Sequence, residues 1–148
     1  MHYPLFLNLK GKKVAVFGAG KVGTRKVKTL LAAGAKVEVF SREYSGELRR
    51  LSKRSPSRLK LKPHATTESL LSNAVLGFAA TSDAKFNQRV ALLCRKRGLW
   101  VNVADDPGQC DFYVPALVKK NGFQIAISTG GKNPRRAKKL RLALSKNL

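Results

Sequence analysis

Apolar and polar positions follow two rhythms along this chain, and the rhythms alternate. Short apolar runs rich in β-branched residues, each closed by a polar or glycine-containing segment, are typical of buried strands. Between them, apolar residues recur every three or four positions, which is the spacing of an amphipathic helix. The strands expected on this pattern cover residues 12–20, 35–41, 74–82 and 99–105, and residues 58–64, which alternate apolar and basic positions, are expected to form an edge or third strand. The expected helices, two of them short, cover residues 21–35, 43–57, 66–73 and 83–98.

This alternation predicts an α/β fold of the Rossmann type, with a doubly wound parallel sheet. Two further strand-like runs, 112–120 and 123–129, flank a Lys-Asn-Gly turn, and a strongly basic helix is expected over 133–148. This last part leaves the alternating pattern. We therefore expect a nucleotide-binding domain over residues 1–112 and a short strand and helix extension over 113–148, together in a single compact unit.

A glycine-rich segment predicts what this fold binds. Gly18, Gly20 and Gly23 have the G-x-G-x-x-G spacing, directly after an expected strand and at the start of an expected helix. The first glycine of this pattern permits a tight turn, the second lets the backbone approach a pyrophosphate, and the third lets helix and strand pack closely. The helix N-terminus offers unpaired N–H groups to the phosphates. The segment therefore predicts a dinucleotide site.

The end of the second expected strand leaves the choice of dinucleotide open. Folds that bind NAD usually carry an acidic residue there for the ribose hydroxyls. This strand instead ends in Phe40, Ser41 and Arg42, and Glu43 follows slightly late. Ser41 and Arg42 could hold the 2′-phosphate of NADP. The residues thus predict a nicotinamide dinucleotide without separating NAD from NADP.

The net charge of the chain predicts an anionic partner. The chain has 148 residues, with 30 Lys or Arg against 8 Asp or Glu, and a net charge of +22. Such a surface favours nucleic acid, an acidic membrane surface or a polycarboxylate small molecule, or it reflects the proteome of the source. Aromatic residues make up only 7% of the chain and none lies in the basic C-terminal segment, which disfavours nucleic-acid binding.

Other signals in the composition are weaker. No apolar run approaches the roughly 18 residues of a membrane helix, and the N-terminus lacks a signal-peptide pattern. Cys94 and Cys110 have no paired spacing. They are expected to be free thiols in the cytoplasm, and no metal site is expected.

All the aspartates of this basic chain lie in one region: Asp83, Asp105, Asp106 and Asp111. The carboxyl ends of parallel strands meet at one edge of a sheet, so the segments 18–23, 79–87 and 102–107 should converge on one crevice. Asp83 is expected to cap a helix, and Asp106 to form a turn. Asp105 follows a strand directly and is the candidate for a working carboxylate.

With these segments in view, the chain resembles the precorrin-2 dehydrogenases, the NAD-dependent module of siroheme synthases. The resemblance lies in residues 3–27, 78–90, 101–118 and 125–141, which run in the family's order. The glycine motif is shared by many proteins. Its combination with Asn-Val-Ala-Asp-Asp-Pro and with Ile-Ser-Thr-Gly-Gly-Lys-Asn-Pro is far more specific.

The resemblance implies an enzyme that oxidises precorrin-2 to sirohydrochlorin with NAD as hydride acceptor. It implies that Asp105 is the acid–base carboxylate, and that the Ser-Thr-Gly-Gly segment contributes to the tetrapyrrole pocket. The candidate cofactor residues are Gly18, Gly20, Lys21, Val22, Gly23, Ser41, Arg42, Glu43 and Thr81. The candidate substrate residues are Asn102, Ser128, Thr129, Gly130, Gly131 and Lys132.

The resemblance also implies a homodimer and, in some members, metal insertion. Many members continue beyond the position of Leu148 with a helical domain, which leaves ferrochelatase activity open here. Precorrin-2 carries eight carboxylates, so a basic surface would serve to capture it. Three alternatives remain: a basic nucleotide-binding sensor, a nucleic-acid-binding module on the same fold, and a nicotinamide enzyme with another substrate.

Overall fold

The computed structural model describes residues 2–65, 68–104 and 106–147. Their contacts divide the chain into two units. The larger one, which we call the sheet unit, consists of residues 6–111. The smaller one, the hairpin unit, combines the N-terminal residues up to Leu5 with the chain from Phe112 onward.

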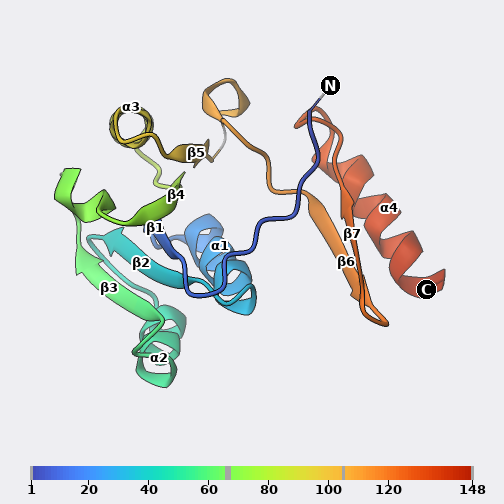
Figure 1. The fold of residues 1–148 in the computed structure, drawn as a ribbon, viewed down its shortest axis with the longest axis horizontal. Coiled ribbons are helices and arrows are strands. Elements are labelled where there is room, and N and C mark those ends of the chain that lie inside the picture. The colour runs from blue at the N-terminus through green and yellow to red at the C-terminus, as the bar shows by residue number, and fades with distance from the viewer. Residues whose placement is uncertain (1, 66–67, 105, 148) are drawn as a thin grey trace. The chain divides into compact units, whose positions relative to one another are not determined.

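The sheet unit contains a parallel sheet with helical crossovers, as the alternating pattern predicts (Figure 1). Its strands are β1 (Lys13–Phe17), β2 (Lys36–Ser41), β3 (Leu59–Pro63), β4 (Ala74–Ala79) and β5 (Trp100–Val103). Its helical segments are α1 (Lys21–Ala32), α2 (Gly46–Arg54), α3 (Ala84–Lys96) and the 3₁₀ turns η1 (Glu68–Leu71) and η2 (Pro107–Gln109). The strand order is β3-β2-β1-β4-β5, the Rossmann-like order that places the first strand inside the sheet.

Side chains of β1 alternate between two buried layers because neighbouring residues in a strand face opposite sides. Phe17 belongs to the core cluster that includes Phe86 and Cys94 of α3, and its ring stacks on Phe40 at 4.9 Å between centroids. A Cβ at Gly77 would lie 2.4 Å from the Sγ atom of Cys94. Helix α3 therefore packs on β4 at a distance that only glycine permits.

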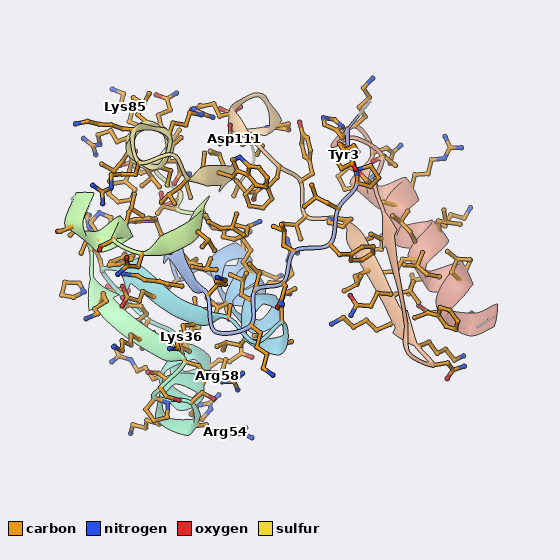
Figure 2. The ribbon with its side chains drawn as sticks, in the orientation of Figure 1. Tyr3, Lys36, Arg54, Arg58, Lys85 and Asp111 are labelled. Atoms are coloured by element: carbon orange, nitrogen blue, oxygen red, sulfur yellow. The ribbon has the colours of Figure 1, made fainter. Side chains whose placement is uncertain are left out.

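Asp111 closes the outer edge of β5 (Figure 2). Its N–H donates to the Val101 carbonyl and its Oδ2 accepts from the Val101 N–H, both at 2.9 Å. Its Oδ1 pairs with Arg95 at 3.3 Å. These bonds occupy main-chain groups that an edge strand would otherwise expose. The structure thus gives one of the grouped aspartates a role in the fold.

The hairpin unit contains the predicted closing strands and terminal helix. The antiparallel strands β6 (Ala116–Lys120) and β7 (Phe123–Ile127) pair, and α4 (Pro134–Asn147) packs against them. Asn121 and Gly122 at the turn have φ angles of 51° and 80°, the positive values that a tight two-residue hairpin requires. Within the described ranges, no helix of either unit is long and apolar enough to cross a membrane.

Candidate functional site

The strand order locates a binding site at the carboxyl ends of β1 and β4. From β1 the chain proceeds outward through β2 to β3, whereas β4 and β5 extend the sheet on the other side of β1 (Figure 1). In open α/β sheets, ligands bind at the carboxyl edge where the order reverses in this way. The glycine-rich segment follows β1 at this point.

The structure gives a different reason for glycine at each of the three positions of this segment. Gly18 has a φ of +105°, and a Cβ there would lie 2.4 Å from the Ala80 carbonyl oxygen. A Cβ at Gly23 would lie 2.1 Å from the Gly18 carbonyl oxygen. A Cβ at Gly20 would meet no atom within 4 Å. The fold itself therefore requires the first and third glycines, whereas the second borders open space of the kind that a bound pyrophosphate fills.

Helix α1 presents its N-terminus to this space. Gly20 is its N-cap residue, no side chain caps it, and the first turn contains Lys21 and no acidic residue. The Thr24 N–H donates to the Gly20 carbonyl at 2.9 Å, so the N–H groups of Lys21 and Val22 precede the first helical bond and are available to an anion. The Thr24 hydroxyl donates to the Ala19 carbonyl at 3.2 Å and holds the turn from within.

The sheet brings the predicted segments together. The hydrogen-bond ladder continues one residue beyond three strand ends: from Gly18 N to Phe40 O (2.9 Å), from Ala80 N to Phe17 O (2.7 Å) and from Ala104 N to Ala79 O (2.7 Å). The segments that follow β1, β4 and β5 are therefore neighbours, which confirms the predicted convergence for the described residues. Asp105, the predicted catalytic carboxylate, lies outside the described residues.

Thr81 is held in the segment after β4 by a side chain that the sequence did not single out. The Thr81 hydroxyl and N–H lie 2.7 and 3.2 Å from the Oδ1 atom of Asn87, whose amide donates back to the Thr81 carbonyl at 3.0 Å. Asn87 is buried in α3. Asp83 caps the same helix by accepting from the Phe86 N–H at 2.9 Å, as predicted.

A pocket of about 250 Å³ lies between the segments after β4 and β5. The residues that line it are Thr81, Ser82, Ala84, Asn87, Gln88, Val103, Ala104, Asp106 and Gln109. Asp106 directly precedes η2 and accepts a hydrogen bond from the Gln109 amide at 2.6 Å, so its carboxylate lies in a turn, as predicted. Thr81 therefore borders a pocket at the carboxyl edge of the sheet, where the dinucleotide is predicted to bind.

Asn102, a predicted substrate residue, is occupied by contacts within the protein. Its side-chain oxygen accepts from Lys26 Nζ at 2.7 Å, and its amide lies 3.4 Å from the Sγ atom of Cys110. The same Sγ atom lies 3.2 Å from both the N–H and the carbonyl of Val103. Burial is the main cause that raises the pKa of the Cys110 thiol, which therefore remains protonated near neutral pH. The thiol holds the end of β5 near η2.

Tyr44 holds the segment predicted to bind the adenosine ribose. Its hydroxyl accepts from the N–H groups of Ser41 and Lys62, both at 3.1 Å, lies 2.8 Å from the Val39 carbonyl and also contacts the Lys62 carbonyl. Burial is the main cause that raises the pKa of this phenol. Ser41 is half-buried, whereas Arg42 and Glu43 extend into solvent. Tyr44 thus fixes the backbone from which these two residues project.

The remaining predicted residues form a turn in the hairpin unit, between β7 and α4. Gly130 and Gly131 have φ angles of 63° and 78°. The Gly130 N–H donates to the Ser128 hydroxyl at 3.1 Å, and the Lys132 N–H donates to the Thr129 carbonyl at 3.2 Å. The structure describes this turn within its own unit, so its part in a tetrapyrrole pocket stays a prediction.

Comparison with known proteins shows which proteins the chain is similar to. The family described as "Putative NAD(P)-binding" matches residues 5–116. Siroheme synthase of Nitrosomonas eutropha is 37% identical over 147 residues, which cover 97% of this chain and 30% of that protein. Siroheme synthase of Methylococcus capsulatus is 36% identical over 140 residues, which cover 95% of this chain and 29% of that protein. The chain thus spans about 30% of the length of these relatives.

A solved structure extends the match to the whole chain. SirC, a precorrin-2 dehydrogenase, has a TM-score of 0.83 and 30% identity, over 99% of this chain and 71% of that one. A Granulicella formate dehydrogenase, 19% identical with a TM-score of 0.52 over 71% of this chain and 27% of that one, shares the fold alone. The chain therefore belongs to the precorrin-2 dehydrogenase and siroheme synthase N-terminal family.

Proposed function

We propose that this protein is an NAD-dependent oxidoreductase that converts precorrin-2 to sirohydrochlorin. The observation that carries the proposal is the glycine turn at the carboxyl edge of the sheet. There, two glycines are required by backbone contacts and the third faces open space. Family membership supplies the reaction, because the neighbour SirC is a precorrin-2 dehydrogenase.

The residues of the sheet unit would hold the dinucleotide along this edge. Its pyrophosphate would occupy the space beside Gly20 and accept from the N–H groups of Lys21 and Val22. Ser41, Arg42 and Glu43 would contact the adenosine ribose. Bound NAD supplies the hydride acceptor for the reaction. Thr81, which Asn87 holds, would lie at the nicotinamide end.

The oxidation removes one hydride and one proton from the macrocycle, so a base must accept the proton. We assign this role to Asp105, the carboxylate that the family resemblance implies, because it closely follows β5 in the sequence and a carboxylate can accept such a proton.

The strong positive charge would serve substrate capture. A chain of net charge +22 attracts an octacarboxylate from a distance, which raises the rate of encounter. In the turn after β7, the N–H groups of Gly130 and Lys132 are already bonded within the turn. We therefore assign recognition of a substrate carboxylate to the Ser128 hydroxyl proton and the Lys132 ammonium group.

A homodimer is the assembly that the hairpin unit supports. Phe123, Leu140 and Leu142 of this small unit have exposed fractions of 69%, 49% and 46%. A homodimer would cover such apolar side chains. Light scattering coupled to size-exclusion chromatography would give the mass, and a monomer at all concentrations would contradict this assembly.

Anaerobic incubation with NAD and enzymatically made precorrin-2 tests the function. We expect the sirohydrochlorin spectrum to appear together with NADH. Asp105→Ala should abolish turnover while leaving NAD affinity largely intact. Asp83→Asn, which keeps a side-chain oxygen able to cap α3 and leaves the backbone bonds of Asp83 to Thr81 in place, should retain turnover. NAD binding without turnover would favour another substrate, and the absence of NAD binding would contradict the cofactor site itself.

A further inference from the structure

A second pocket, of about 220 Å³, lies at the opposite end of the strands from the glycine turn. We call it the basal pocket. It is lined by Lys13, Lys36, Val37, Glu38, Ser57, Arg58 and Lys60. Lys13 and Lys36 begin β1 and β2, whereas the glycine turn follows the last residue of β1. Figure 2 shows Lys36 and Arg58 at this end of the sheet unit, with Arg54 of α2 in the same region.

The basal pocket exists because the sheet lacks an apolar cover there. Register pairs Lys13 with Lys36 and Glu38 with Lys60, so these side chains share the sheet face on which Phe17 and Phe40 pack against the α3 core. Among the described residues between β3 and β4, the helical segment is the four-residue turn η1. So short a segment cannot cover the whole face, and charged residues occupy the part left open.

The charges of the basal pocket are unbalanced. Lys13 Nζ pairs with Glu38 Oε2 at 2.9 Å, and both side chains are mostly buried. Arg58 donates from one guanidinium nitrogen to the Leu31 carbonyl at 3.2 Å, which fixes its position. For Lys36, Arg58 and Lys60, no described carboxylate lies within ion-pair distance. Three positive charges therefore line one concavity whose described carboxylate, Glu38, is already paired with Lys13.

The chemistry of the lining identifies the ligand class. A concave surface of one sign concentrates counter-ions, and Arg and Lys together are the side chains that bind phosphate oxygens. Among the described residues that line the pocket there is no aromatic ring on which a base could stack. We propose that the basal pocket is a binding site for phosphate groups, separate from the dinucleotide site. The ligand is either a free diphosphate or the backbone of a nucleic acid.

Titration calorimetry of the full chain with inorganic pyrophosphate tests the site. Lys36→Gln combined with Lys60→Gln removes two charges from the basal pocket. Lys138→Gln combined with Lys139→Gln removes two charges from exposed positions of α4 and leaves the pocket intact. If the pocket binds the anion, the first pair should weaken affinity by at least about tenfold, because charge-assisted contacts are lost, and the second by less than about twofold.

Three results would overturn the proposal. The first is the absence of saturable binding, and the second is equal weakening of affinity by both pairs of substitutions. The third is a loss of pyrophosphate binding in Gly20→Ala while the variant with Lys36→Gln and Lys60→Gln still binds pyrophosphate as the wild type does. The last result would move the anion to the glycine turn. Competition by a short DNA duplex then identifies the source of the phosphate: a duplex that displaces pyrophosphate from the wild type indicates a nucleic-acid backbone, and one that does not indicates a free diphosphate.

Discussion

Replacing Gly23 with alanine should damage the fold before it affects the cofactor. The added Cβ would lie 2.1 Å from the Gly18 carbonyl oxygen and 2.9 Å from its carbon, both of them backbone atoms. Helix α1 would have to move away from β1 by roughly an ångström to restore an ordinary contact. Overpacking of this kind costs about 1–3 kcal/mol, and the gain in helix propensity from alanine, about 1 kcal/mol, offsets only part of it.

Gly20→Ala is the matched control, because it adds the same methyl group three residues earlier in the same motif, where the group enters open space. Its Cβ would meet no protein atom within 4 Å, and the residue's φ of −70° and ψ of −171° suit alanine. The free energy of unfolding should change by less than about 1 kcal/mol. The methyl group would instead occupy the proposed pyrophosphate space, so NAD affinity should fall by about tenfold or more.

Two measurements separate these effects. Urea denaturation followed by the fluorescence of Trp100, the single tryptophan, reports the stability of the sheet unit, and calorimetry reports NAD affinity. We expect Gly23→Ala to lower stability and Gly20→Ala to lower affinity at nearly unchanged stability. A Gly20→Ala variant that binds NAD as tightly as the wild type would refute the placement of the pyrophosphate.

Three further changes test other contacts. Tyr44→Phe leaves main-chain groups at the ends of β2 and β3 without the hydroxyl, so urea denaturation should show a loss of about 1–3 kcal/mol and calorimetry a weaker affinity for NAD; unchanged values would contradict its positioning role. Burial raises the pKa of Cys94 from 9.0 to about 11. The unfolded thiol therefore ionises first as pH rises, and stability should fall between these values more steeply in the wild type than in Cys94→Ala; equal slopes would argue against a buried, protonated thiol. Asp111→Ala removes the acceptor for Val101 and the partner of Arg95, so we expect a loss of about 1–2 kcal/mol by urea denaturation and association through the exposed edge of β5 by light scattering, whereas a stable monodisperse variant would show that the edge needs no closure.

The order of strands and helices could be predicted because it depends on local periodicity. Most strands of the sheet are short apolar runs, β3 alternates Leu and Lys, and each crossover carries its own helical spacing or turn residues. The glycine turn was predictable for the same reason, since the three glycines, the strand and the helix are adjacent in sequence. Asp83 as a helix cap is also a local feature, because its acceptor group lies three residues from the N–H that it binds.

Contacts that depend on strand register could not be read from the sequence. Lys26 reaches Asn102 across 76 residues, and only the packing of α1 over β4 and β5 brings the two together. The contacts of the Asn102 side chain with Lys26 and Cys110 could not be read from the sequence either, and its role as a substrate residue stays a prediction.

A crystal structure of the protein with bound NAD tests the central claim most directly. We predict a pyrophosphate against Gly20 that accepts from the N–H groups of Lys21 and Val22, with the adenosine ribose beside Ser41 to Glu43 and the nicotinamide toward Thr81. A dinucleotide seated away from the carboxyl edge of β1 and β4, or one whose phosphates do not meet the start of α1, would contradict it.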